Sequence, residues 1–278
     1  MKRWFSVIAV IVVLGFASCK SFPSSRSLHD DGKLEVDFVQ VNDVYEIAPL
    51  DNGKIGGMAR VAALKKEYLQ KNANTVLVMA GDFVSPSVYN SLKYHDTAIR
   101  GKQMIEAMNT AGFDLAVFGN HEFDIKEDEL QQRIDESNFQ WVSSNSFHNL
   151  KGQIVPFAKT KANISSAFPK VYFKTFKDTD GTEVKIAFIG LTLPFNKADY
   201  VSYTDPDSSA MELYKQVKDS CDAVIAVTHQ AVEDDVKLRN NYPASPSYLA
   251  DMSTICVLKK QAMCILQKLM PMRGLRLS

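Results

Sequence analysis

The sequence predicts an α/β fold with β-rich insertions. Short apolar runs of strand type alternate with amphipathic helical stretches along most of the 278 residues. Hydrophobic residues make up 46% of the chain, which is enough for one sizeable core. Four of the apolar runs end in Asp, Asn or His, and strand ends are where ligands bind in α/β folds.

The chain begins with a predicted targeting segment, residues 1–19. A basic start precedes an apolar stretch over residues 5–16, which is too short to span a bilayer comfortably. Ala17-Ser18-Cys19 resembles a bacterial lipobox with a lipidated cysteine, although Phe16 stands where Leu is usual. The alternative is a plain secretory signal with an incidental cysteine. Residues 20–33 are polar and Ser-rich, which predicts a tether.

The alternation continues through the rest of the chain. Val, Ile, Leu and Phe dominate the expected strands, which cover residues 34–42, 76–81, 115–118, 140–145, 184–192 and 222–227. Apolar residues at helical spacing predict helices over residues 56–72, 101–111, 126–137, 210–220 and 233–241. Methionines in the second helix are expected to fill the core. Residues 151–177 are mixed and rich in turns, and Asn145 is expected near the edge of a site.

Polar motifs follow four of these strands. They are Asn42-Asp43, Gly81-Asp82, Gly119-Asn120-His121-Glu122-Phe123-Asp124 and Thr228-His229. One such motif is usually an ordinary turn, but four polar strand ends of this kind together indicate a functional site. Mixed Asp, Asn and His ligands suit zinc, manganese or iron. The remaining histidines, His29, His95 and His148, have no motif around them and are expected to be non-functional.

These motifs, with Gly56-Gly57-Met58-Ala59-Arg60, occur in the order found in the calcineurin-like metallophosphoesterases. The chain resembles that family, and within it the bacterial 5'-nucleotidases, from about residue 35 to residue 240. The resemblance implies a four-layer αββα sandwich over residues 34–246. It also implies hydrolysis of nucleotide phosphates with two divalent metal ions, because such a pair holds a phosphate and activates water.

The resemblance assigns a role to each site residue. Asp82 would bridge the two metals, Asp43 would serve one of them, and Asn120 with His229 would serve the other. His121 would face the leaving oxygen as the acid/base, and Asp124 would hold its imidazole and stabilise imidazolium. Tyr45 departs from the pattern, since the family has a metal-binding His there. It could bind a metal or donate a hydrogen bond, or the first metal position could be weakened.

Residues 247–278 depart from the family more strongly. The family has Gly-His-x-His here, one His for each metal, whereas this chain has no His after His229. One interpretation is an amphipathic C-terminal helix carrying Leu258, Met263, Leu266 and Leu269. The other is a change of reading frame near codon 246, because shifted codons can spell Gly-Gly-His-Glu-His. We expect an out-of-frame tail, a sandwich incomplete at its C-terminal end, and an exposed sheet edge.

The function expected from the sequence is a nucleotide phosphoesterase whose activity is impaired in this chain. A phosphodiesterase or general phosphatase of the same fold is the alternative enzyme, and a non-catalytic envelope lipoprotein is the alternative of another class. Lys plus Arg equals Asp plus Glu at 32 each, so no nucleic-acid partner is expected. We expect a monomer at the cell envelope, periplasmic or on the outer surface, that meets the membrane only through a lipid anchor.

The lipobox generates a testable prediction. The mature chain should begin at Cys19 and carry lipid, so Cys19→Ser should move the protein from the membrane to the soluble fraction, whereas Cys221→Ser should not. A single acyl chain binds membranes only marginally, so we expect the lipid on Cys19 to carry more than one acyl chain. Mass spectrometry of the mature N-terminus checks this, and an unmodified N-terminus at another residue would contradict it.

Overall fold

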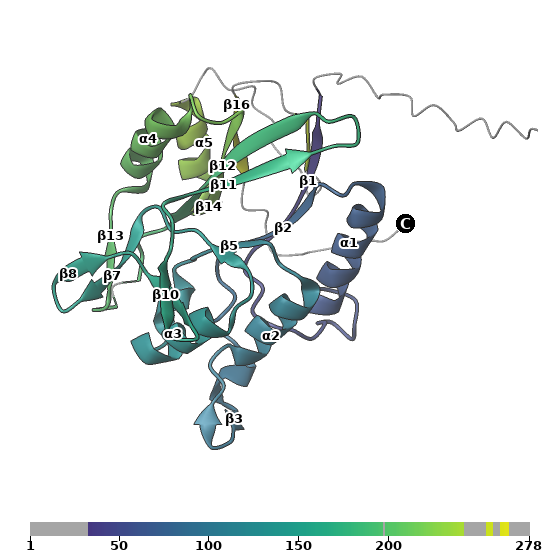
Figure 1. The fold of residues 1–278 in the computed structure, drawn as a ribbon. Coiled ribbons are helices and arrows are strands. Elements are labelled where there is room, and N and C mark those ends of the chain that lie inside the picture. Colours follow the sequence, from purple (N-terminus) through teal and green to yellow (C-terminus); the bar gives the residue numbers. More distant parts are fainter. Residues whose placement is uncertain (1–32, 197, 242–253, 258–261, 267–278) are drawn as a thin grey trace, which may run out of the picture.

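The computed structural model describes residues 33–196, 198–241, 254–257 and 262–266 (Figure 1). Two sheets stack face to face, and helices cover the outer face of each. The fold is therefore the four-layer αββα sandwich that the resemblance implied. The predicted signal segment, Cys19 and nearly all of the predicted tether lie outside the described residues. Within the described part of the chain, no helix is long and apolar enough to cross a membrane.

The first sheet has the strand order β15-β1-β2-β5-β6. Four of its strands are parallel, namely β1 (Glu35–Val41), β2 (Thr75–Ala80), β5 (Leu115–Val117) and β6 (Gln140–Trp141). The edge strand β15 (Thr254–Val257) runs antiparallel to β1. The helices packed with this sheet are α1 (Met58–Lys71), α2 (Lys102–Ala111) and α3 (Glu127–Glu136).

The second sheet has the order β11-β12-β14-β16. Its strands are β11 (Val171–Lys177), β12 (Glu183–Thr192), β14 (Ala223–His229) and β16 (Ala262–Leu266). The helices α4 (Pro206–Val217) and α5 (Val232–Asn240) cover its outer face (Figure 1).

Short elements complete the described chain. They are the 3-10 turns η1 (Val88–Ser91) and η2 (His121–Asp124), the hairpin β3 (Lys93–Tyr94) with β4 (Thr97–Ala98), the pair β9 (Ala158–Lys161) with β10 (Ile164–Ala167), and the small sheet of β7 (Ser146–Leu150), β8 (Gln153–Val155) and β13 (Val201–Tyr203).

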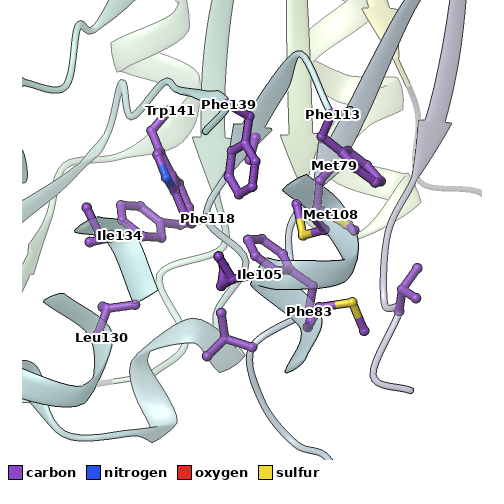
Figure 2. Close-up of a cluster of buried hydrophobic side chains, with 14 of the residues drawn as sticks. Met79, Phe83, Ile105, Met108, Phe113, Phe118, Leu130, Ile134, Phe139 and Trp141 are labelled. Atoms are coloured by element: carbon purple, nitrogen blue, oxygen red, sulfur yellow. The ribbon is translucent and has the colours of Figure 1, made fainter. Parts of the chain in front are cut away.

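Side chains of the central strands alternate between two buried layers. In β2, Val76 and Val78 face the second sheet, whereas Leu77 and Met79 face the helices, and all four are at most 1% exposed. Figure 2 shows the helix-side cluster, in which Met79 and Met108 pack among aromatic rings. The prediction that the methionines of the second expected helix fill the core is confirmed, since Met104 and Met108 in α2 are fully buried.

Most predicted helices and strands occur with small shifts of their ends, but the strand expected over residues 140–145 covers only Gln140–Trp141. Helix α4 begins four residues earlier than expected, because Asp205 caps it by accepting a 2.8 Å hydrogen bond from Ser208 N and Pro206 fits the first turn. Strand β11 was not predicted. It alternates half-buried and exposed side chains within a turn-rich stretch, so its apolar signal is weak.

The C-terminal strands correct one interpretation. Met263 and Leu266 lie in β16, so a C-terminal helix is wrong at these positions. Since β15 pairs with β1 and β16 pairs with β14, β15 and β16 are edge strands of the two sheets, and the exposed edge stays a prediction. Both strands are short and rich in apolar or β-branched residues, which favours β-structure. Residues 247–253 lie outside the described chain, and the frame change stays a prediction.

Candidate metal centre

The carboxyl ends of four strands from both sheets meet at the candidate centre. The turns after β1, β2 and β5 carry Asp43, Asp82 and Asn120, and β14 ends at His229. Strand register makes this possible, since Val41 pairs with Met79 and Ala80 pairs with Val117. The ligand atoms of Asp43, Asp82 and His229 all lie within 4.8 Å of one another.

His229 is oriented for metal binding. Its ring is 1% exposed, and Nδ1 lies 2.7 Å from the carbonyl oxygen of Ala80. A hydrogen bond donated there leaves Nε2 as the free nitrogen, 3.1 Å from Asp82 Oδ2. Burial would lower the pKa of His229, but the hydrogen bond and charge of Asp82 raise it. Burial would likewise raise the pKa of Asp82, but His229 lowers it.

The turns after β2 and β5 approach each other so closely that both require glycine. A Cβ on Gly81 would lie 2.5 Å from Gly119 N, and a Cβ on Gly119 would lie 2.1 Å from Asp82 Oδ1. Gly81 also has a φ of 82°, which side-chain-bearing residues rarely adopt. Asp43 and Asp82 themselves have φ values of 54° and 59°. Strained backbone of this kind is concentrated at functional sites.

Tyr45 reaches the centre through its hydroxyl. The oxygen lies 3.0 Å from Asp43 Oδ1 and 3.1 Å from Asp82 Oδ2, and its one proton can be donated to either. Burial, and then the charges of Asp82 and Asp43, raise the pKa of this hydroxyl far above its ordinary value. Of the alternatives that the sequence left open, the hydrogen-bonding tyrosine is the arrangement observed.

The predicted His–Asp pair stands beside the metal ligands. His121 Nδ1 lies 2.5 Å from Asp124 Oδ2, and the His121 backbone N–H donates a 2.9 Å hydrogen bond to Asp82 Oδ1. Both side chains are about one-third exposed, so a substrate can reach them. Burial would lower the pKa of His121, but the hydrogen bond to Asp124 and the charge of Asp82 raise it. Asn196 donates a hydrogen bond to the other oxygen of Asp124.

Two residues that hydrogen-bond to the candidate centre, Glu122 and Asn196, could not be identified from the sequence. Glu122 is fully buried and accepts hydrogen bonds from backbone N–H groups of both turns. Asn196 belongs to a loop 72 residues from Asp124. The only sequence signal was the place of Glu122 inside the Gly119–Asp124 motif.

Three further residues named in the sequence analysis, Asn145, His148 and His95, lie outside the metal-ligand group. Asn145 does not reach the centre, because its side chain is fully buried and bonded to the backbone of Thr192. His148 pairs with Glu127, and His95 makes an edge-on ring contact with Tyr94. Neither belongs to the group of metal-ligand candidates.

The donor set fits a divalent metal ion. Two carboxylates and an imidazole nitrogen converge, and the contact of the other ring nitrogen with a backbone carbonyl orients the imidazole. Carboxylates at this spacing repel each other, and Asp82 is buried, so a cation placed between them would relieve that cost. The mixture of oxygen and nitrogen ligands suits zinc, manganese or iron.

The family model for calcineurin-like phosphoesterases matches residues 36–254. The chain therefore belongs to the calcineurin-like phosphoesterase family, whose members use divalent metals.

Individual relatives agree with this assignment. The chain is 30% identical over 194 residues to the trifunctional nucleotide phosphoesterase YfkN of Bacillus subtilis, covering 64% of this chain and 12% of that protein. It is 26% identical to UshA of Yersinia enterocolitica, covering 69% of this chain and 33% of the relative. The chain thus spans a third or less of the length of these two relatives.

Solved structures confirm the fold. The NAD nucleotidase NadN of Haemophilus influenzae superposes with a TM-score of 0.58 at 21% identity, over 74% of this chain and 40% of that chain. The crystal structure of YfkN gives a TM-score of 0.55 at 23% identity, over 72% and 63%.

The close approach of the two turns generates a prediction. In a chain whose reading frame is restored after codon 246, Gly119→Ala should push Asp82 out of place, lower the free energy of unfolding by about 1–3 kcal/mol, and weaken Mn²⁺ binding. Gly152→Ala is the control, because its Cβ meets nothing within 4 Å and only its φ of 98° is strained. Denaturant titrations and Mn²⁺ isotherms measure both effects. A Gly119→Ala protein as stable as the parent would show that the turns are further apart.

Proposed function

We propose that the protein is a metal-dependent phosphoesterase of the 5'-nucleotidase type. One observation carries this proposal: the metal-ligand group of Asp43, Asp82 and His229 lies beside the pair of His121 and Asp124. A cation site supplies charge for a phosphate, and the His–Asp pair supplies a proton. Together they match what hydrolysis of a phosphate ester requires.

Some of the chain's residues would bind metal, and others would transfer a proton. Asp43 and Asp82 would hold one metal, and Asp82, Asn120 and His229 would hold the other. Two divalent ions supply Lewis acidity that offsets the negative charge of the phosphate and activates water. His121 would give a proton to the leaving oxygen, and Asp124 would keep the ring oriented and stabilise its charge.

The proposed substrates are nucleoside monophosphates, with cyclic or sugar nucleotides as further candidates. The named activities of the relatives support this choice, since YfkN is a nucleotide phosphoesterase and the similar snake venom proteins are 5'-nucleotidases. A phosphodiesterase or general phosphatase of the same fold is the alternative. The proposed location is the cell envelope, with the chain anchored as a monomer through lipid on Cys19.

A non-catalytic envelope lipoprotein is the second candidate function. Tyr45 favours it, because its hydroxyl bonds to both carboxylates at the position of a family metal ligand. The number of Mn²⁺ ions bound per chain distinguishes the two. A catalytic centre requires both metal positions to fill, whereas the binding module would take up little metal.

The acid/base role of His121 is tested in a chain whose reading frame is restored after codon 246. His121→Ala should lower turnover of a nucleoside monophosphate by about two to four orders of magnitude, the scale for losing a positioned acid/base. Metal content should persist, since His121 is not a ligand, whereas Asp82→Ala should lose both metals. His95→Asn is the matched control, because His95 is exposed and its left-handed backbone suits Asn. Near-normal turnover of His121→Ala would overturn the assignment.

The tail generates a separate prediction. With residues 247–278 as they stand, the protein should bind little metal and release no phosphate from nucleotides above background. Each metal lacks a ligand that the family takes from Gly-His-x-His, and a metal pair needs both positions filled. Insertion of one base near codon 246 should restore both properties. Robust metal-dependent activity in the unaltered chain would mean that the tail supplies other ligands.

A further inference from the structure

The side chain of Glu122 makes an unusually complete set of contacts. It is fully buried, and its carboxylate accepts four backbone hydrogen bonds. Oε1 accepts from Phe83 N at 2.7 Å and from Val84 N at 3.0 Å. Oε2 accepts from Asp82 N at 2.8 Å and from Gly119 N at 2.6 Å. All four lone-pair directions of the carboxylate are therefore used.

These four donors come from two separate segments of the chain. Three successive N–H groups, those of residues 82–84, form a concave anion site of the kind that left-handed turns create. The fourth N–H belongs to Gly119, in the turn after β5. The carboxylate of Glu122 thus ties the turn that carries Asp82 to the turn that carries Asn120.

Only a glutamate meets this requirement. A glutamine has one oxygen, so its NH₂ group would face two of the four buried N–H donors and leave them unsatisfied. An aspartate is one methylene shorter and cannot span both turns from the same backbone position. The chemistry of the site therefore calls for an acceptor-only group of this length.

The turns after β2 and β5 are also packed against the hydrophobic core through the residue next to each turn. Phe83 follows Asp82 and Phe118 precedes Gly119, and both rings are fully buried in the cluster of Figure 2. The pairing of Ala80 with Val117 fixes where the two turns begin. Beyond that point, the Glu122 bonds and the bond from His121 N to Asp82 Oδ1 join one turn to the other.

We propose that Glu122 is a positioning residue that sets the spacing of Asp82 and Asn120 before any metal binds. The proposal deepens the function proposed above and rests on it for the ligand roles of Asp82 and Asn120. Glu122 has no vacant lone pair for a metal or a substrate. It acts through the backbone of the residues that it holds.

Hydrogen exchange in the metal-free full chain tests whether the arrangement is preformed. The amides of residues 82, 83, 84 and 119 should exchange at least 100-fold more slowly than in an unfolded chain, and adding Mn²⁺ should change their rates by less than threefold. Protection that develops only after Mn²⁺ is added would overturn the proposal. This measurement uses the parent protein, so it decides the question even if substitutions of Glu122 do not fold.

Substitution tests the consequence for the centre. In a chain whose reading frame is restored after codon 246, Glu122→Gln should weaken Mn²⁺ binding by about 10–100-fold, the usual scale for losing a group that orients metal ligands. It should also release the four amides to faster exchange.

Asp114→Asn is the matched control. Asp114 Oδ2 accepts a 2.9 Å hydrogen bond from Leu77 N and so ties β5 to β2 at the opposite end of the same strands. Loss of this hydrogen bond in Asp114→Asn should lower the midpoint temperature of thermal unfolding and leave Mn²⁺ affinity unchanged.

The outcomes separate this proposal from the function on which it rests. If Glu122→Gln lowers the thermal midpoint as Asp114→Asn does and Mn²⁺ affinity is unchanged, Glu122 is merely structural and the proposal is wrong. If the parent takes up no Mn²⁺ even with its frame restored, the proposed function fails, and the exchange rates alone then decide whether Glu122 presets the two turns.

Discussion

The contact between the turns after β2 and β5 determines the geometry of the whole centre. Gly81 and Gly119 bring the two backbones together at a distance that no side chain would permit. Asp82 adopts left-handed backbone there, and its Oδ1 bonds to the next turn while Oδ2 faces His229. Without that contact, the ligands would belong to independent loops, and no common metal position would exist.

The centre concentrates negative charge in a buried place. Asp82 and Glu122 are at most 2% exposed, and Asp43 and Asp124 lie close by. Burial, and then the charge of Asp82, raise the pKa of Glu122 to about 7, although its backbone donors oppose this rise. Burying unpaired charge is costly, so each carboxylate has a defined set of donors. The same concentration of charge makes the centre attractive to a cation.

Much of this arrangement could be predicted from the sequence. Apolar runs ending in Asp or His predicted that Asp43, Asp82 and His229 would converge, because parallel strands deliver their carboxyl ends to one edge. The pair of His121 and Asp124 is local, three residues apart, so a motif could reveal it. Glu122 and Asn196 could not be recognised, because their roles depend on partners 40 and 72 residues away. Pairing at the C-terminal edges was also missed, since a five-residue apolar run fits a helix or a strand equally well.

The bond between His229 and Ala80 has a consequence for how the protein is made. Its two ends are separated by 149 residues, and it joins the second sheet to the first. Contacts of such separation form late, because a long loop must close before they are gained. A nascent chain that ends before residue 229 can pair the four parallel strands of the first sheet and form the His121–Asp124 pair, but it has no complete metal group. The centre is therefore assembled only after most of the domain has been synthesised, so a chain that crosses a membrane unfolded would acquire its metal at its destination.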